Sequence, residues 1–518
     1  MGLRLQRAIQ FGEPRLVLGS NYLSWFVCFL SNIFSTKSEP KLGGVAIAVI
    51  ILIFVLIAGI FSSVMVRTQA HQSLIGEFKE ISSEKSKLPV LDIANAPLVS
   101  EDMARRAAEK QLSTTEYVSL GSRVHIGHLE KQRVGKNLYW VAFLEHRDFF
   151  KWSANSTTPG YVMVSAHNPN DVKLVTHVAG KELKLRYLHS ASFGDNLERH
   201  VYFNDMTRGI AEFIPEIDDE GNPFYVAPVF KRKIGLFGGK DVTSVLVVNP
   251  QNGDITEYPL DKAPAWIDRI QPQSYVTDQI DNNLKLAGGW WNWSGNNILQ
   301  VSGTVDMVFM EDGSPYFYVG YQSTGGDNAI VGFALVNSRT KQAFNIKMSG
   351  IAEKVAESAA EKAYPEKHYQ ATNALPFMVE GIPTYVMALR DSNGVSRMYS
   401  MVSVASVQKI AVADTLEATV RQYLSKVAQE EASSDIGSQY RPTVLKGKIL
   451  RISPMVKNGN SVYVVKLQGY NKLLNAGSEV AEEIAITEAG DEVEISVQEG
   501  KTFATIIEIK NLSLAPAK

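Results

Sequence analysis

Histidine spacing is the first feature of this sequence that bears on chemistry, because pairs of imidazoles at short intervals bind transition metals. His125 and His128 lie three residues apart in a segment that we expect to be a strand. Side chains of a strand alternate between its two faces, so these two would point apart and would not share an ion. The other seven histidines show no paired spacing. We therefore expect no metal and no other cofactor.

Glycines and carboxylates offer two weaker candidates. The run from Ile234 to Lys240 contains three glycines, but it lacks the spacing and the trailing Ser or Thr of a phosphate-binding loop. It is better explained as the tip of a hairpin. The acids from Glu216 to Glu220 lack the ligand alternation of a calcium loop, which favours a solvated turn. A nucleophile elbow and a zinc-protease helix motif are also absent from the sequence, so we predict no catalytic residues and no enzymatic activity.

Aromatic residues are the remaining candidates, and they would act in binding. Two groups are singled out as candidate binding residues: the tryptophans of the segment 263–297 and one tyrosine from each of three similar segments. They are Trp266, Trp290, Trp291 and Trp293, and Tyr225, Tyr318 and Tyr385. The tryptophans suit a sugar-stacking or partner-binding platform, although such a cluster is more often a covered apolar corner. The tyrosines suit a ligand groove, although aromatic side chains more often pack in the core.

An uncharged stretch near the N-terminus governs the expected location of the protein. Leu42–Val66 contains no charged residue over 25 positions, and as a helix it would extend about 37 Å, enough to cross a bilayer. Residues 1–42 hold five basic and two acidic residues, which places the N-terminus on the cytoplasmic side. The sequence therefore predicts a single-pass protein of the cell membrane with the bulk of the chain outside the cytoplasm.

The stretch Leu16–Phe34 leaves an alternative topology open. It is apolar and aromatic, but Ser and Asn residues interrupt it, which favours an interfacial helix lying on the membrane surface. If it spans the membrane instead, the topology inverts and the large C-terminal portion is cytoplasmic.

A repeated turn organises the rest of the chain. An acid, a Gly and then a Pro two residues later precede an aromatic strand at Glu220–Val226, Asp312–Val319 and Glu380–Val386, with a weaker copy at Gly135–Val141. Gly supplies a positive backbone φ, and Pro begins the strand. Each copy is followed by a second strand, and one of these ends in the hairpin signal Asn252-Gly253. The pattern predicts one hairpin unit used about four times.

These units, each with a helix such as Glu101–Leu112 or Ile351–Tyr364, resemble PepSY modules, the small helix-plus-antiparallel-sheet domains of bacterial envelope proteins and peptidase propeptides. The resemblance rests on the G-x-P-x-Y-V turn and strand. It implies an α+β fold and a role in restraining or binding other proteins.

Charge is segregated in the C-terminal segment, where five or six short strands with Gly turns resemble an OB-like barrel. Six basic residues precede Glu479, and eight acids without a base lie between Glu479 and Glu499. A basic face for an anionic partner is one interpretation. Pairing of opposite charges across neighbouring strands is the favoured one, because the segment 444–518 holds nine basic and nine acidic residues.

Together these features predict an α+β protein with one transmembrane helix, PepSY-like modules and a C-terminal barrel. The expected parts are a cytoplasmic segment 1–41 with the interfacial helix, a span 42–66, a linker 67–94, modules 95–190, 191–300 and 301–430, a linker 431–443 and a barrel 444–518.

The expected function is a membrane-anchored, extracytoplasmic binding or scaffold protein of the bacterial envelope. Its expected partners are the lipid bilayer and an envelope protein or polymer, and the net charge of -2 argues against nucleic acid. Two alternatives stay open. One is a cell-wall-directed hydrolase, and the other is the inverted topology with a nucleic-acid-binding barrel in the cytoplasm.

Overall fold

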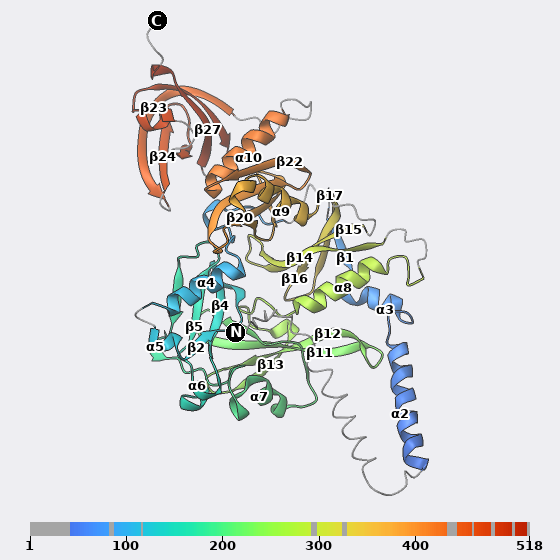
Figure 1. Ribbon diagram of the computed structural model, residues 1–518. Coiled ribbons are helices and arrows are strands. Elements are labelled where there is room, and N and C mark those ends of the chain that lie inside the picture. The colour runs from blue at the N-terminus through green and yellow to red at the C-terminus, as the bar shows by residue number, and fades with distance from the viewer. Residues whose placement is uncertain are drawn as a thin grey trace, which may run out of the picture. The chain divides into compact units, whose positions relative to one another are not determined.

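The computed structural model of the 518-residue chain describes residues 42–81, 88–114, 118–291, 298–323, 329–431, 443–457, 460–477, 482–499 and 503–514 (Figure 1). Contacts divide it into two units. One comprises residues up to Thr68 with Arg232–Gly239, and the other comprises Gln69–Lys231 with Lys240–Lys518. The expected interfacial helix at 16–34 lies outside the described residues.

The first unit contains helix α2 (Leu42–Phe61) and the tip of the hairpin between β11 (Pro223–Ile234) and β12 (Gly238–Val248). The described side chains of α2 are mostly exposed. The hydroxyl of Ser62 accepts hydrogen bonds from the backbone N–H groups of Leu236 and Phe237, at 2.9 and 3.1 Å. The glycine run predicted to form a hairpin tip does so, with positive φ at Gly235 and Gly239.

The predicted membrane span is corrected by this structure. Over the described part of the chain, no helix combines the length and the apolarity that crossing a bilayer requires. The prediction of a single-pass cell-membrane protein, with the bulk of the chain outside the cytoplasm, is therefore wrong.

The predicted α+β class is also wrong, because strands hold most of the ordered backbone in the described residues. Four five-stranded sheets and one closed barrel form the framework. Their segments are rich in aromatic and β-branched residues and are separated by tight turns, a composition that favours strands over helices. Several of the helices are a single turn or two long.

The first sheet has the order β2-β4-β5-β6, with β3 also pairing β4. Helix α4 covers one face of it, with Ala104 and Ala108 completely buried against the strands (Figure 1). Its elements are α4 (Glu101–Leu112), α5 (Val118–Gly121), β2 (Val124–Ile126), β3 (Glu130–Val134), β4 (Asn137–His146), α6 (Phe149–Ala154), β5 (Tyr161–Ser165) and β6 (Val172–Val175).

The second sheet has the order β10-β11-β12-β13, with β9 also pairing β11. Leu197 and Val201 of α7 pack into the same apolar cluster as its strands and the first sheet's Phe143. The elements are β7 (His177–Val178), β8 (Lys181–Glu182), α7 (Leu197–Asn204), β9 (Gly209–Ile210), β10 (Ile214–Ile217), β11 (Pro223–Ile234), β12 (Gly238–Val248) and β13 (Ile255–Pro259).

The third sheet has the order β1-β17-β16-β15-β14. Strand β1 comes from far earlier in the sequence and adds in parallel to the edge strand β17. Val276 and Ile280 of α8 are buried against this sheet. The elements are α3 (Thr68–Gln72), β1 (Phe78–Ile81), α8 (Gln273–Lys285), β14 (Leu299–Phe309), β15 (Pro315–Ser323), β16 (Ala329–Asn337) and β17 (Ala343–Ile351).

The fourth sheet has the order β18-β20-β21-β22, with β19 also pairing β20. Two helices contact it, α9 on one apolar cluster and α10 on another. The elements are α9 (Glu353–Lys362), β18 (Gln370–Ala371), β19 (Leu375–Val379), β20 (Ile382–Arg390), β21 (Ser396–Ser403), β22 (Ser406–Ala413) and α10 (Leu416–Glu431).

The C-terminal strands close a barrel in the order β23-β24-β25-β27-β26, with β25 and β27 parallel. Lys446 lies opposite Glu494 in the ladder, and their side chains form a salt bridge of 2.5 Å. The favoured cross-strand pairing of opposite charges is therefore confirmed at this position. The strands are β23 (Thr443–Lys457), β24 (Asn460–Leu467), β25 (Leu473–Gly477), β26 (Glu492–Glu499) and β27 (Phe503–Asn511).

The repeated turn recurs at the same place in all four sheets. Gly135, Gly221, Gly313 and Gly381 have φ between 62° and 89°, and each joins two antiparallel strands of a hairpin. The second strand of each hairpin then pairs with the next strand in sequence. The predicted fourfold use of one hairpin unit is confirmed. The resemblance of these units to PepSY modules stays a prediction.

Candidate functional site

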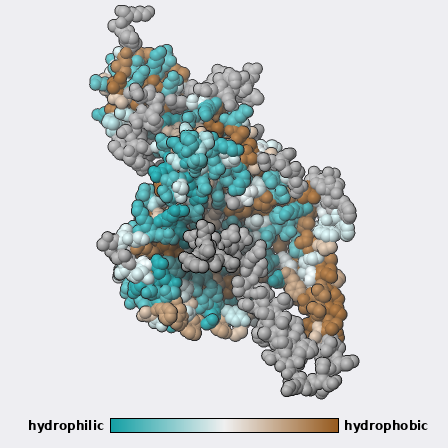
Figure 2. All heavy atoms as spheres, viewed as in Figure 1, coloured by the Kyte–Doolittle hydropathy of each residue, from teal (hydrophilic) through white to brown (hydrophobic). Residues whose placement is uncertain are grey.

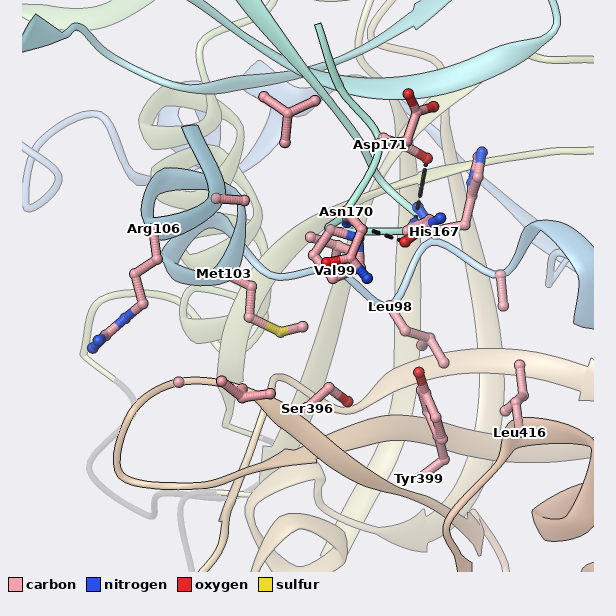
Figure 3. Close-up of a pocket in the computed structure, with 18 of the residues that line it drawn as sticks. Leu98, Val99, Met103, Arg106, His167, Asn170, Asp171, Ser396, Tyr399 and Leu416 are labelled. Carbon is pink, nitrogen blue, oxygen red and sulfur yellow. Dashed lines mark hydrogen bonds between the residues drawn. The ribbon is translucent and has the colours of Figure 1, made fainter. Parts of the chain in front are cut away.

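A cavity with a volume of about 1130 Å³ lies between the first and fourth sheets of the larger unit. Figure 3 shows Leu98 and Met103 pointing into it from one side and Ser396, Tyr399 and Leu416 from the other. The walls come from the segment 93–99, helix α4, the β5–β6 turn, the β20–β21 turn and the start of α10. We call this cavity the α4–β21 cleft.

The α4 wall forms because the local sequence specifies a capped amphipathic helix. The hydroxyl of Ser100 accepts the N–H of Met103 at 3.4 Å, and Glu101 and Asp102 lie in the first turn, where acids are favourable. The helix buries its alanine face on β5, which leaves Arg106, Lys110 and Gln111 along the cleft.

The segment leading into α4 is fastened to both sheets. The N–H of Val99 donates to the carbonyl of Ala166, and the indole N–H of Trp140 donates to the carbonyl of Val99, which ties the segment to the first sheet. Leu98 packs into the apolar cluster of the fourth sheet and α10. The apolar floor of the cleft is thus held in place from two sides.

The opposite wall is organised by the β20–β21 turn. The carboxylate of Asp391 accepts the N–H groups of Asn393 and Val395, and Gly394 has a φ of 75°. Arg106 donates to the carbonyl of Asn393 at 3.1 Å, and Arg390 pairs with Asp102 at 2.8 Å. A side chain at position 394 would collide with the guanidinium of Arg106, so glycine permits this close approach.

Two residues that line the cleft each hold a buried polar atom without a hydrogen-bond partner: Nδ1 of His167 and Oγ of Ser396. Burial lowers the pKa of His167, although Asp171 and Asp92 oppose this. The imidazole is therefore neutral at pH 7 and offers one donor and one acceptor.

Neither of these atoms was singled out from the sequence. His167 was noted only as lacking a histidine neighbour, and Ser396 carries no motif. The sequence around His167 carries only a turn signal, Asn168-Pro169-Asn170-Asp171. This signal predicts a loop, but it does not predict which part of the protein packs against the loop.

The three candidate tyrosines lie in the core. Tyr225, Tyr318 and Tyr385 are at most 1% exposed. Their hydroxyls donate to Glu145 at 3.0 Å, Glu353 at 2.7 Å and the carbonyl of Ile351 at 3.1 Å. They therefore satisfy buried acceptors, and none of them lines the cleft.

The candidate tryptophans fall in separate places. Trp266 is half-buried and stacks on Phe224 of β11, with ring centroids 5.3 Å apart. Trp290 and Trp291 follow α8 and make an edge contact at 4.7 Å, and Trp291 is 70% exposed. Trp293 lies outside the described residues. The structure thus places Trp266 on a sheet face and places Trp290 and Trp291 after the end of α8.

Buried charge gathers at a junction of the first sheet, the second sheet and the segment before α8. Arg269 donates to both oxygens of Glu130 at 2.7 Å and to Glu212 at 3.0 Å. His128 bonds to Glu130 at 2.8 Å, and this hydrogen bond raises the pKa of His128 above its ordinary value, against the effect of burial. These groups neutralise one another within the protein.

The solvated acidic turn predicted before Gly221 is only partly correct, because Asp219 and Glu220 are exposed but Glu216 and Asp218 are buried. Glu216 is 2% exposed, and its carboxylate accepts the N–H groups of Asp268 and Arg269 at 3.0 and 3.1 Å. Asp218 is also buried and accepts the N–H of Asn222. The burial of Glu216 could not be predicted from nearby sequence, because the backbone N–H groups that bind its carboxylate come from a distant segment.

In the part of the chain that the structure covers, no group of three or more His, Cys, Asp or Glu side chains is arranged to hold a metal ion. The buried carboxylates Glu145, Glu216 and Glu353 are each engaged by donors of the protein.

Comparisons with known proteins add little. No family model matches the chain, and no curated protein matches it. A solved structure that matches, a GH32 beta-fructofuranosidase of Bombyx mori, is 10% identical, with 79% of this chain and 70% of that chain covered and a TM-score of 0.19. The prediction that the chain has no enzymatic activity is dropped. At this TM-score the likeness carries no argument about fold, activity or substrate.

Proposed function

We propose that the chain is a binding protein and that the α4–β21 cleft accepts an extended segment of a partner polypeptide. The observation that carries the proposal is one large cavity that pairs an apolar floor with polar and charged residues along both walls.

Size argues for an extended ligand. Cavities for single small molecules span about 300–1,000 Å³, and this cleft exceeds that range at about 1130 Å³. A peptide presents alternating side chains and backbone amides, so it places apolar groups on Leu98 and Met103 while its amides bond to polar groups of the walls.

Charge and hydrogen-bonding capacity support a peptide over a strongly charged ligand. The cleft is lined by the cations Arg106 and Lys110 and by the anions Asp171, Asp414 and Glu417. Both signs are present, and His167 is neutral. Backbone amides, which carry no net charge, suit such a surface better than a phosphate or a polyanion does.

The proposal is tested with a variant in which a larger side chain fills the α4–β21 cleft. Peptides are first selected on the full-length protein from a displayed random library, and their affinities are then measured by fluorescence polarisation. Ser396→Trp introduces an indole into the cavity and is expected to weaken the selected peptides at least about tenfold, a loss of about 1.4 kcal/mol.

Ile486→Ser, an exposed residue of the barrel region, serves as the matched control and is expected to leave the affinities unchanged. Equal binding to the Ser396→Trp variant and to the unmodified protein would place the site elsewhere and refute the proposal.

A further inference from the structure

A patch of large exposed side chains lies away from the lining of the α4–β21 cleft. It consists of Phe149, Phe150, Phe193, Tyr202, Phe203 and Met206, and we call it the α6–α7 aromatic patch. Figure 2 shows apolar residues gathered on the surface over α6 and α7. Soluble surfaces rarely carry so many large apolar side chains together unless they bind something.

Ring contacts join the α6 part of the patch and Phe193 into one cluster. The ring centroid of Phe193 lies 6.2 Å from that of Phe149 and 5.7 Å from that of Trp152, which joins the loop before α7 to α6. Arg199 of α7 donates to the carbonyl of Phe193 at 3.5 Å. One helical turn further, Tyr202 and Phe203 are in edge contact.

The backbone holds these rings outward at a cost. Phe193 has a φ of 54°, a left-handed conformation that is strained for an aromatic residue, and its side chain is nevertheless 63% exposed. Helix α6 is capped by Asp148, whose carboxylate accepts the N–H of Lys151 at 3.0 Å. This cap presents Phe150 with 78% of its surface in solvent.

The rim of the patch holds three exposed cations and, at the α6 cap, the exposed acid Asp148, so it is net basic. Arg147, Lys151 and Arg199 are exposed within the same two helices and their approaches. Two of the acids nearby are already paired: Glu198 with His189, and Asp205 with Arg208 at 3.0 Å. The rim therefore attracts anionic groups.

We infer that the α6–α7 aromatic patch docks on an anionic lipid surface. Protruding rings on separate short helices insert into a fluid acyl boundary without needing matched pockets, and the surrounding cations bind lipid phosphates. A folded protein partner would need a complementary hollow for each of Phe150 and Phe203. This is a peripheral contact and requires no spanning helix.

The experiment reports insertion at the patch itself, independently of any other part of the chain. In a Cys28→Ser background, single cysteines at Phe150→Cys, Phe203→Cys and Ile486→Cys are labelled with the polarity-sensitive dye NBD in the full-length protein. Vesicles of phosphatidylcholine with phosphatidylglycerol, or of phosphatidylcholine alone, are then added.

The expected result is a blue-shifted, brighter emission at positions 150 and 203 with the anionic vesicles, and no change at position 486, which is exposed to a similar degree. Lys151→Gln is expected to lower the partition into anionic vesicles about fivefold, the effect of one basic residue near such a surface.

Three outcomes would overturn the inference. They are no spectral change at 150 and 203 while the protein floats with the vesicles, an equal response to neutral vesicles, and a response only to an added protein or acidic peptide. Circular dichroism of the labelled variants confirms that they are folded, since each replaced side chain is exposed.

Discussion

At the scale of single residues, the protein repeatedly places a carboxylate in its interior and satisfies it with donors from remote segments. Glu216 and Asp268 show the consequence most clearly, because both are nearly inaccessible to water. Burial raises the pKa of Glu216 well above its usual range, and the charge of Asp268 adds to this effect. Burial likewise raises the pKa of Asp268 to about 6. The folded protein therefore retains protons that the unfolded chain has already released.

The pH dependence of stability follows from these two residues. Between pH about 4 and about 6, the folded state binds more protons than the unfolded state, so the free energy of unfolding decreases as the pH rises. We expect Glu216→Gln to flatten this decrease, because the amide oxygen still accepts an N–H group but no longer titrates. Urea denaturation from pH 4.5 to 7 measures the slope. An unchanged slope in the variant would show that these carboxylates do not titrate in this window.

At the scale of secondary structure, the turn geometry that the four hairpins share depends on glycine. Each turn requires a positive φ, which an L-residue adopts only at a cost. The aromatic strand that follows is then buried, with Tyr225, Tyr318 and Tyr385 in equivalent roles as core donors. A local backbone requirement thus sets the start of a core strand in each sheet.

We expect Gly221→Ala to lower the free energy of unfolding by about 1–2 kcal/mol, because it forces a side chain into the left-handed region. Its φ is 89°, and the added Cβ would lie 3.3 Å from the hydroxyl of Tyr161. Gly194→Ala is the control, since its Cβ would meet nothing within 4 Å and its φ is not positive. Chemical denaturation of both variants measures the difference, and equal stabilities would contradict the role assigned to the turn.

At the scale of the larger unit, the sheets are joined by buried polar contacts as well as by apolar clusters. Gln132 of β3 exchanges two hydrogen bonds with the backbone of Ile217 in β10. Arg269 links Glu130 of the first sheet to Glu212 at the edge of the second. Removing one charged residue from such a group leaves the opposite charge of its partner buried and uncompensated.

Arg269→Met is therefore expected to lower the free energy of unfolding by about 3–5 kcal/mol, with partial recovery when Glu130→Gln is added. Arg397→Met provides the comparison, because the Arg397–Asp391 pair is half-exposed and its loss is expected to cost less than about 1 kcal/mol. Urea titrations of the three variants test this. A small effect of Arg269→Met would mean that the apolar clusters alone hold the sheets together.

The sequence by itself determined those features that depend on neighbouring residues. The glycine turns and the hairpin tip at Gly235–Gly239 follow from short-range steric and hydrogen-bonding rules. The predictions of an α+β fold class and of a membrane span, both based on local composition, were wrong. Local composition also placed Glu216 in solvent, because the donors that bury it lie about fifty residues away in the chain.

Only the tertiary structure decided where function could lie. The α4–β21 cleft is built from segments near residues 98, 167, 396 and 416, and the α6–α7 aromatic patch joins two helices from different parts of the chain. No local pattern encodes that His167 and Ser396 line one cavity. Whether a polar atom is satisfied, or an aromatic ring is buried, depends on what the remote chain brings to it, and that is a property of packing rather than of sequence spacing.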